Sequence, residues 1–309
     1  MPHVRLAVFP VASAVTVAAV LFAGACTGED PVLPSGADSG ASDSATDGAS
    51  LTDVAVPEAS SEAGSDGSLP SGERYACPSA KPVPRTGSER AIFEPSGLIV
   101  DGSGRLVAWE ESRSKRRAVP ENPSAGASRV LDCCASFAAS GALAYTSGSE
   151  LEVGGGAAFA LHTLVRRTTG GASSAGGGAM VVKKPTASFP FTGFALTVAG
   201  RDPTAGLEDK PAFQLRYDPR IAAVDTTPFP TGVFVNFSGV RTETELVVQI
   251  GTRRIPGAYD NLDVGNRDPM FIGGGGDNHF VGEVCAVVLE VGDQSASEVR
   301  SNAIGAYRP

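Results

Sequence analysis

The segment from Phe280 to Val291 constrains the fold of this chain more than any other stretch. Successive residues of a strand point to opposite faces, and here both faces are apolar in the middle. One face is expected to take Cys285, Val287 and Leu289, and the other Val284, Ala286 and Val288. Such a strand is typical of the interior of a covered sheet. Met270–Ile272 and the glycines 273–276 precede it and predict a short strand and a turn.

Short apolar runs separated by turns rich in Gly, Pro and Ser continue this pattern through most of the chain. Residues 142–153 predict a hairpin and residues 159–167 a long alternating strand. Two further strands are expected to point Val233, Val235 and Phe237, and Leu246, Val248 and Ile250, inward. About a dozen such strands, with almost no helical period, predict an all-β, two-sheet antiparallel sandwich or barrel.

Two segments of the body depart from the strand pattern. Residues 111–128 predict a polar loop, with four cations close together at Arg113, Lys115, Arg116 and Arg117. The simplest interpretation is a solvated loop, and the alternative is a patch that binds anions or sulfated glycans. In the tail, Ser295 and Glu298 fit a capping box and predict one short C-terminal helix.

The first 25 residues have the features of an export signal. Arg5 precedes the apolar run 11–22, whose length suits a signal-peptide core and is short for a spanning helix. The run ends in Ala-Gly-Ala-Cys at residues 23–26, which resembles the lipobox of bacterial lipoproteins. The resemblance implies a lipid on Cys26 and, because Thr27 follows, sorting to the outer membrane of a Gram-negative bacterium. The alternative is an ordinary cleaved signal peptide, in which Cys26 carries no lipid. Both interpretations place the mature protein outside the cytoplasm.

Residues 26–75 form a predicted tether between this anchor and the folded domain, which we place at residues 76–309. Between residues 27 and 75, ten acids accompany a single base, Arg74, and large apolar residues are few. Such a segment cannot bury enough surface to offset its ordering entropy, so we expect disorder. The domain carries 23 Lys and Arg and 24 Asp and Glu, so it has no field that would attract nucleic acid.

Four cysteines remain when Cys26 is set apart: Cys77, Cys133, Cys134 and Cys285. An even number in an exported domain predicts two disulfide bonds. Neighbouring residues of a strand point to opposite sides, so Cys133 and Cys134 should bond to different partners, one to Cys77 and the other to Cys285. Each bond closes a long loop and would contribute about 4 kcal/mol in the chain-entropy model.

Several runs, taken in order, resemble the concanavalin A-like or laminin G-like jelly-roll family. The matching stretches are residues 106–109, 142–151, 159–165, 246–251, 270–274, 280–289 and the Ser-x-x-Glu helix. The resemblance covers about residues 90–309 and implies a jelly-roll sandwich of the kind found on bacterial surface proteins. The strand at 233–236 lacks the Trp-His pair that is often present in the family.

Residues of the types used in catalysis are present but do not form a recognised pattern. Glucanases on this fold carry Glu-x-Asp-x-x-Glu on one strand. The pairs Glu243 with Glu245 and Glu150 with Glu152 lack the third acid, and the two domain histidines, His162 and His279, do not make a zinc site. We therefore predict that the chain is not an enzyme and holds no cofactor, with calcium as the one possible exception.

The oxygen-rich loops at residues 259–263 and 277–278 are the candidates for calcium binding. The resemblance implies calcium at the rim of the sandwich, for which Asp260, Asp263 and Asp277 are candidates, and turn formation is the simpler alternative. Candidates for contact with a sugar are Tyr145, Tyr217, Tyr259 and Asn278, since sugar rings stack on aromatic side chains.

The sequence as a whole predicts a membrane-anchored, extracytoplasmic binding module. Its expected partners are the membrane, through the lipid, and carbohydrate or another cell-surface component. Two alternatives stay open: a structural or protein-interaction lipoprotein of the envelope without a small ligand, and a divergent glycoside hydrolase.

Overall fold

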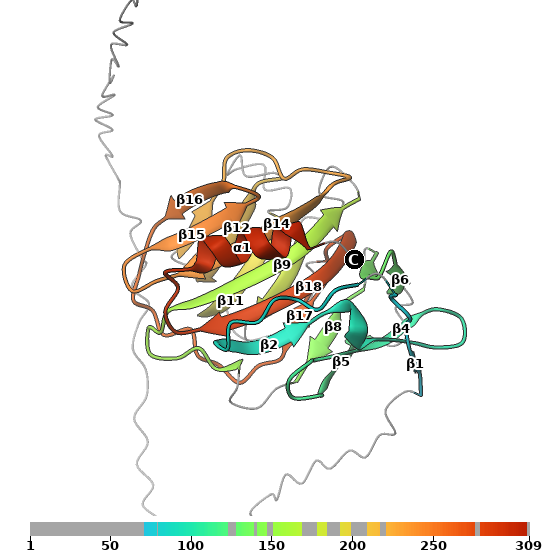
Figure 1. Ribbon diagram of the computed structural model, residues 1–309. Coiled ribbons are helices and arrows are strands. Elements are labelled where there is room, and N and C mark those ends of the chain that lie inside the picture. Colours follow the sequence, from blue (N-terminus) through green and yellow to red (C-terminus); the bar gives the residue numbers. More distant parts are fainter. Residues whose placement is uncertain are drawn as a thin grey trace, which may run out of the picture. The chain divides into compact units, whose positions relative to one another are not determined.

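The computed structural model describes residues 71–78, 80–122, 128–138, 141–146, 151–168, 178–183, 192–198, 209–216, 221–275 and 279–307. Over these residues the chain forms two antiparallel sheets and one short C-terminal helix (Figure 1). The all-β sandwich predicted from the sequence is therefore confirmed. The predicted signal peptide, Cys26 and most of the predicted tether lie outside the described residues.

The larger sheet contains ten strands within the described part of the chain. In spatial order these are β1 (Glu73–Arg74), β3 (Leu98–Val100), β4 (Leu106–Glu110), β5 (Arg117–Pro120), β8 (Leu143–Tyr145), β17 (Met270–Ile272), β10 (Gly178–Lys183), β11 (Thr192–Val198), β12 (Pro211–Arg216) and β13 (Ile221–Val224). The first of them, β1, lies in the segment that the sequence assigned to the tether.

The second sheet is arranged around the strand with two apolar faces. In spatial order it contains β16 (Arg253–Gly257), β15 (Leu246–Ile250), β14 (Phe234–Arg241), β9 (Phe159–Arg167), β18 (Gly282–Val291), β7 (Cys134–Phe137) and β6 (Arg129–Leu131), and β2 (Glu89–Phe93) also pairs with β18. β18 pairs with β9 from Gly282 opposite Arg167 to Val291 opposite Phe159. The helix α1 (Ser297–Ala306) packs on β14 and β9 (Figure 1).

The core between the sheets is built from the inward-facing side chains of both. Phe159 packs against Phe194 and Phe213 at centroid distances of 5.3 and 5.7 Å. Each fully buried large apolar side chain contributes about 1.5–3 kcal/mol, so the sandwich depends on this layer. Gly239 of β14 makes room for it, because a Cβ at that position would lie 2.1 Å from the Phe213 ring.

The alternation predicted for β18 is wrong in detail. Val284, Val287 and Leu289 belong to the core between the sheets, whereas Cys285, Ala286 and Val288 belong to a smaller cluster with Ile304 of α1. The register against β9 shifts between Val284 and Ala286. A bulge of this kind adds one residue to a strand, so the faces exchange at Cys285.

Four other local predictions are also corrected. Residues 111–128 are not one loop, because they contain β5. Leu151–Val153, expected as the second hairpin strand, forms no strand, and Val233, expected to point inward, is 52% exposed. The predicted capping box does not form: Ala296 is the N-cap of α1 and makes no side-chain cap bond, while the Ser295 hydroxyl donates to Asp293.

The four cysteines form two disulfide bonds, Cys77–Cys133 and Cys134–Cys285. Neighbouring cysteines therefore bond to different partners, as predicted, although Cys133 lies in a turn with a φ of +60° and only Cys134 belongs to a strand. Disulfides persist in oxidising compartments, so the domain belongs outside the cytoplasm. No helix in the described ranges is both long enough and apolar enough to cross a membrane.

Candidate functional site

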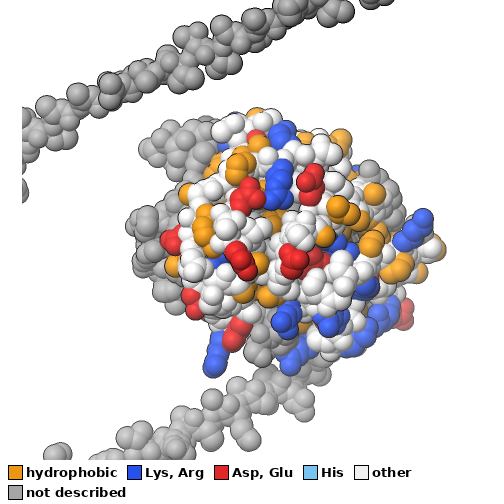
Figure 2. All heavy atoms as spheres, turned by 60° about the vertical axis from the view of Figure 1, so that its left-hand side comes forward, with side chains coloured by type: hydrophobic (Ala, Val, Ile, Leu, Met, Phe, Trp, Pro, Cys, Tyr) orange, Lys and Arg blue, Asp and Glu red, His pale blue; other side chains and the backbone are white. Residues whose placement is uncertain are grey.

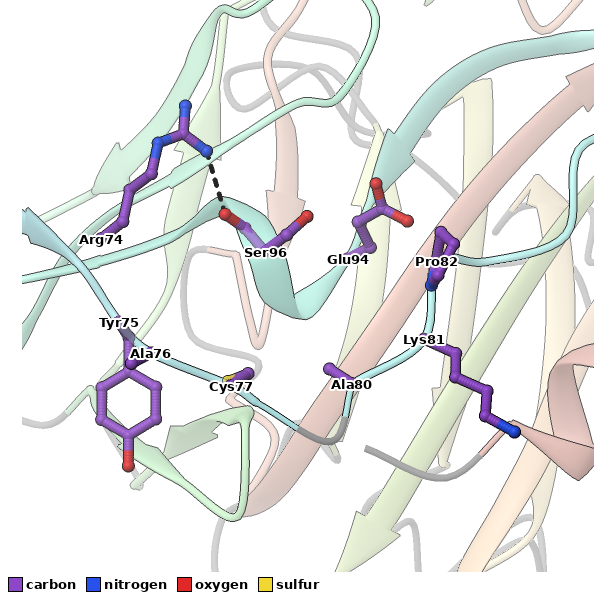
Figure 3. Close-up of a pocket in the computed structure, with 9 residues that line it drawn as sticks. All are labelled: Arg74, Tyr75, Ala76, Cys77, Ala80, Lys81, Pro82, Glu94 and Ser96. Carbon is purple, nitrogen blue, oxygen red and sulfur yellow. Dashed lines mark hydrogen bonds between the residues drawn. The ribbon is translucent and has the colours of Figure 1, made fainter.

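A pocket of about 330 Å³ opens where the chain passes from one sheet to the other (Figure 3). One wall is formed by residues 74–77 and 80–82, and the other is the turn after β2, where Glu94 is followed by the short helix η1 (Pro95–Gly97). Small-molecule sites commonly enclose about 300–1,000 Å³, so this pocket suits a small ligand.

Glu94 holds the wall of the pocket together. Its buried carboxylate accepts hydrogen bonds from the Val83 amide at 3.0 Å, the Arg85 guanidinium at 2.7 Å and the Ser112 hydroxyl at 2.7 Å. Its carbonyl oxygen accepts one from the indole of Trp109 at 2.9 Å. A buried carboxylate with three donors is fully satisfied, so Glu94 acts as a structural anchor for the segments around it.

The groups at the mouth of the pocket are mainly donors and cations. Arg74 donates to the Ser96 carbonyl at 3.0 Å and pairs with Glu110, while its side chain stays 57% exposed. The side chains of Lys81 and Ser96 are also exposed. In Figure 3 the ring of Tyr75 turns away from Ser96 and Glu94, so it lines the margin of the pocket. This arrangement is suited to hydroxyl and carboxylate oxygens of a ligand.

The aromatic residues predicted to contact sugar do not form a site. Tyr145 is fully buried, with its ring 5.1 Å from that of Phe93, so its prediction as a ligand residue is wrong. Its side chain packs in the core because β8 lies in the middle of the larger sheet. Tyr259 is half-buried in the loop after β16 and does not line the pocket. Tyr217 and Asn278 lie outside the described residues.

The predicted calcium residues have other partners or are outside the described part of the chain. Asp263 accepts backbone amides from Gly265 at 2.8 Å and Gly155 at 3.0 Å, which lower the pKa of its carboxyl. Asp260 is exposed, and Asp277 is not described. In the ranges that the structure covers, no three His, Cys, Asp or Glu side chains gather to hold a metal. Calcium binding stays a prediction.

Two cations of the chain donate hydrogen bonds to carbonyl oxygens of residues 262–268, at the end of this loop and just after it. Arg241 donates to the Leu262 carbonyl at 2.6 Å. The ammonium of Lys183 donates to the carbonyls of Asn266 at 2.9 Å and Asp268 at 2.5 Å. Burial lowers the pKa of Lys183. Arginine and lysine therefore supply, from within the chain, positive charge that orders the loop.

A buried polar cluster beneath α1 contains residue types of a hydrolase triad. The Nδ1 atom of His162 lies 2.9 Å from the Ser238 hydroxyl, and its Nε2 atom lies 3.7 Å from Glu290. The histidine and serine are fully buried. Ser238 also contacts the Ser301 hydroxyl at 2.8 Å, so the cluster joins the sheet to α1. The buried cluster has no access for a substrate, so its role is to fix the helix.

Charges in this cluster are paired between α1, β18 and β2. Arg300 donates to Glu290 at 2.8 Å and to Glu89 at 3.1 Å. Burial lowers the pKa of His162. Burial raises the pKa of Glu290, but the interactions with His162, Arg300 and Thr86 outweigh it, so that pKa lies below its ordinary value.

These features define a two-sheet β-sandwich domain with a small, donor-rich pocket at the passage between its sheets. No protein-family model matches the sequence, and no curated protein matches it significantly. Among solved structures, the chain is similar to domain 4 of AbnA, a GH43 extracellular arabinanase from Geobacillus stearothermophilus, in complex with arabinotriose. The TM-score is 0.53 at 12% identity, over 71% of this chain and 98% of that chain.

The chain is also similar to Trypanosoma rangeli sialidase in complex with the inhibitor DANA. The TM-score is 0.50 at 12% identity, over 75% of this chain and 36% of the sialidase, so the chain spans about a third of that protein. At these identities the likeness concerns the fold. It agrees with the predicted jelly-roll-like sandwich.

The prediction that this chain is not an enzyme is contradicted by these comparisons. The arabinanase and the sialidase are enzymes, and each contains a region with this fold. The prediction rests on the absence of a glucanase motif and of a zinc site, and one fold hosts many chemistries with different residues. The lack of a known motif therefore does not show that the chain lacks enzymatic activity.

Proposed function

We propose that this chain is a carbohydrate-binding domain of the concanavalin A-like type that acts outside the cytoplasm. The observation that carries the proposal is the similarity to nearly the whole of the arabinanase domain whose structure contains arabinotriose. The pocket beside Glu94 supports it, because exposed Arg74, Lys81 and Ser96 offer donors for sugar oxygens. The two disulfides support the compartment.

The proposal is tested with the full-length protein and a panel of glycans, measured by titration calorimetry. The panel contains arabinan, arabino-oligosaccharides, sialylated oligosaccharides, neutral glucans and acidic polysaccharides. Saturable binding to at least one glycan is the expected result, weakened severalfold by Arg74→Ala. Arg267→Ala, which alters a side chain that is 94% exposed in the loop after β16, is the control and should bind as the wild type does.

Binding to no glycan would refute the proposal. Product analysis of the same mixtures shows whether a bound glycan is also cleaved. Repeating each titration with calcium and with a chelator tests the calcium prediction, since unchanged affinity in the chelator contradicts it.

We further propose that a lipid on Cys26 holds the protein in the outer membrane of a Gram-negative bacterium, with residues 27–75 as the tether. The lipobox-like residues 23–26 support this proposal. Labelling cells with a fatty-acid analogue should mark the wild type and not Cys26→Ala. Equal labelling of both, or of neither, contradicts the lipid anchor.

A further inference from the structure

The turn between β4 and β5, residues 111–116, presents cations on a fixed backbone. The side chains of Arg113, Lys115 and Arg116 are exposed at its tip. In the part of the chain that the structure describes, Arg113 and Lys115 have no ion-pair partner. Neither charge is therefore neutralised by an acid among the described residues, although the two lie close together on one turn.

A buried carboxylate holds this turn in place. Glu111 is fully buried and accepts hydrogen bonds from the amides of Ile92 at 2.8 Å and Arg113 at 3.0 Å, and from the Ser114 hydroxyl at 2.7 Å. The Ser114 hydroxyl also lies 3.0 Å from the buried Tyr145 hydroxyl. A surface turn that is tied to the core at these points loses little entropy when it binds a ligand.

The turn also contains a strained residue that carries one of its charges. Lys115 has a φ of +61°, in the left-handed region that costs about 1–2 kcal/mol for a residue with a Cβ. Glycine would fit this backbone without strain. A lysine at a position suited to glycine indicates that its charge has a use at the surface.

This turn adjoins the pocket described above. Ser112, at the start of the turn, donates to the Glu94 carboxylate at 2.7 Å, and Glu94 lines the pocket. On the other side, Arg117 lies 3.8 Å from Glu110, which also pairs with Arg74 of the pocket wall. The nearby acids Glu94, Glu110 and Glu111 are buried, whereas the cations reach the surface.

β1, β4 and β5 lie together in the lower part of Figure 1. On the face drawn in Figure 2, Lys and Arg side chains gather along the lower margin, while Asp and Glu side chains lie mostly nearer the centre. Charge is therefore distributed unevenly over that face of the domain.

We propose that the pocket and the turn 111–117 form one site for an acidic polysaccharide. Sugar hydroxyls would bind at the pocket, and uronate carboxylates or sulfate esters would bind at Arg113, Lys115 and Arg116. Guanidinium and ammonium groups form charge-assisted hydrogen bonds with such anions. The inference rests on the proposed carbohydrate-binding function and adds the charge of the ligand to it.

The test compares the full-length protein with two variants that lose the same charge. The site variant is Arg113→Ser with Lys115→Gly, in which glycine relieves the left-handed strain and so protects folding. The control variant is Arg254→Ser with Arg267→Ser, whose cations belong to β16 and the loop after it. In Figure 1, β16 lies at the upper left, opposite β1, β4 and β5. Thermal unfolding verifies that both variants are folded.

The probes are heparin for sulfate, polygalacturonate for carboxylate, arabinan for neutral sugar and double-stranded DNA for charge alone. We expect the wild type to bind at least one acidic polysaccharide, and the site variant to bind it at least about tenfold more weakly. The control variant should change the affinity less than about twofold, because exposed charges that lie away from the site are screened by salt. Raising the salt concentration from about 50 to about 500 mM should weaken polysaccharide binding by the wild type more than binding by the site variant.

Each other outcome gives a clear answer. Binding to arabinan alone overturns the acidic ligand and leaves the carbohydrate-binding function standing. Equal losses in the two variants, or equal binding to DNA, show charge attraction without a site and overturn the inference. Binding to no polysaccharide overturns both proposals.

Discussion

Arg300 joins α1 to the sheet through buried ion pairs, and to the segment before β2 through a hydrogen bond. Arg300 is 5% exposed, and its guanidinium donates to Glu290, to Glu89 and to the carbonyl of Pro84. These partners come from β18, from β2 and from the segment before β2. Replacing Arg300 with methionine keeps much of the side-chain volume and removes every one of these donors.

The cost of Arg300→Met follows from the groups it leaves behind. Glu89 and Glu290 are 3% and 4% exposed, so they would lose their shared cation without gaining water. Removing one partner of a buried ion pair costs about 3–5 kcal/mol. The free energy of unfolding of a domain is typically about 5–15 kcal/mol, so the variant should lose a large fraction of its stability.

Urea unfolding measures this loss, with fluorescence of Trp109 as the probe. Trp109 is the single tryptophan of the chain and lies fully buried in the core, so its signal reports loss of the sandwich. Arg254→Met is the matched control, because its pair with Glu245 is partly exposed and should be worth at most about 1 kcal/mol.

A second variant separates lost charge pairing from lost packing. Adding Glu89→Gln and Glu290→Gln to Arg300→Met removes the unpaired buried charges, so more than half of the stability should return. A cost below about 1 kcal/mol for Arg300→Met, or no recovery in the triple variant, would refute the view that buried ion pairing fixes α1.

Three further predictions concern pH, the disulfides and a tight contact in the core. Burial keeps the pKa of His162 below its ordinary value, so the stability it contributes is complete above about pH 6.5 and falls as the pH drops below that value. His162→Gln should flatten the fall in the free energy of unfolding by up to about 1.4 kcal/mol per pH unit, and a profile parallel to the wild type contradicts this. Replacing both Cys134 and Cys285 with serine opens a loop of 151 residues. In the chain-entropy model this should lower the free energy of unfolding by about 5 kcal/mol. A loss under about 1 kcal/mol would show that the bond is dispensable. Gly239→Ala should lower the thermal midpoint of unfolding, because the added Cβ would overlap the ring of Phe213. The expected loss in the free energy of unfolding is about 1–3 kcal/mol. An unchanged midpoint would mean that the ring moves freely.

The sandwich could be predicted because its signals are local. Alternation along residues 159–167 and 246–250 places the same side chains in the core that the structure places there. Apolar residues on both faces correctly indicate that β18 is an interior strand. The bulge at Cys285 could not be predicted, because it depends on the register against β9 and leaves no mark in the apolar pattern.

The candidate site could not be predicted, because its residues come from separate segments and are of common types. Glu94 and Ser112 lie 18 residues apart and are joined only by the fold. The cations of residues 113–117 are visible in the sequence, but the burial of Glu111, which fixes them, is not. Tyr145 shows the opposite error. It is a candidate in sequence because it is aromatic, but its strand lies in the middle of a sheet and its side chain is fully buried.

Hydrogen–deuterium exchange of the full-length protein, with and without a glycan that binds, tests the central claim most directly. If the pocket and the turn 111–117 form the carbohydrate site, amides in residues 74–82, 92–97 and 111–117 become protected, and those of β15 and β16 do not change. Protection that is confined to other segments, or absent with every glycan of the panel, contradicts the account.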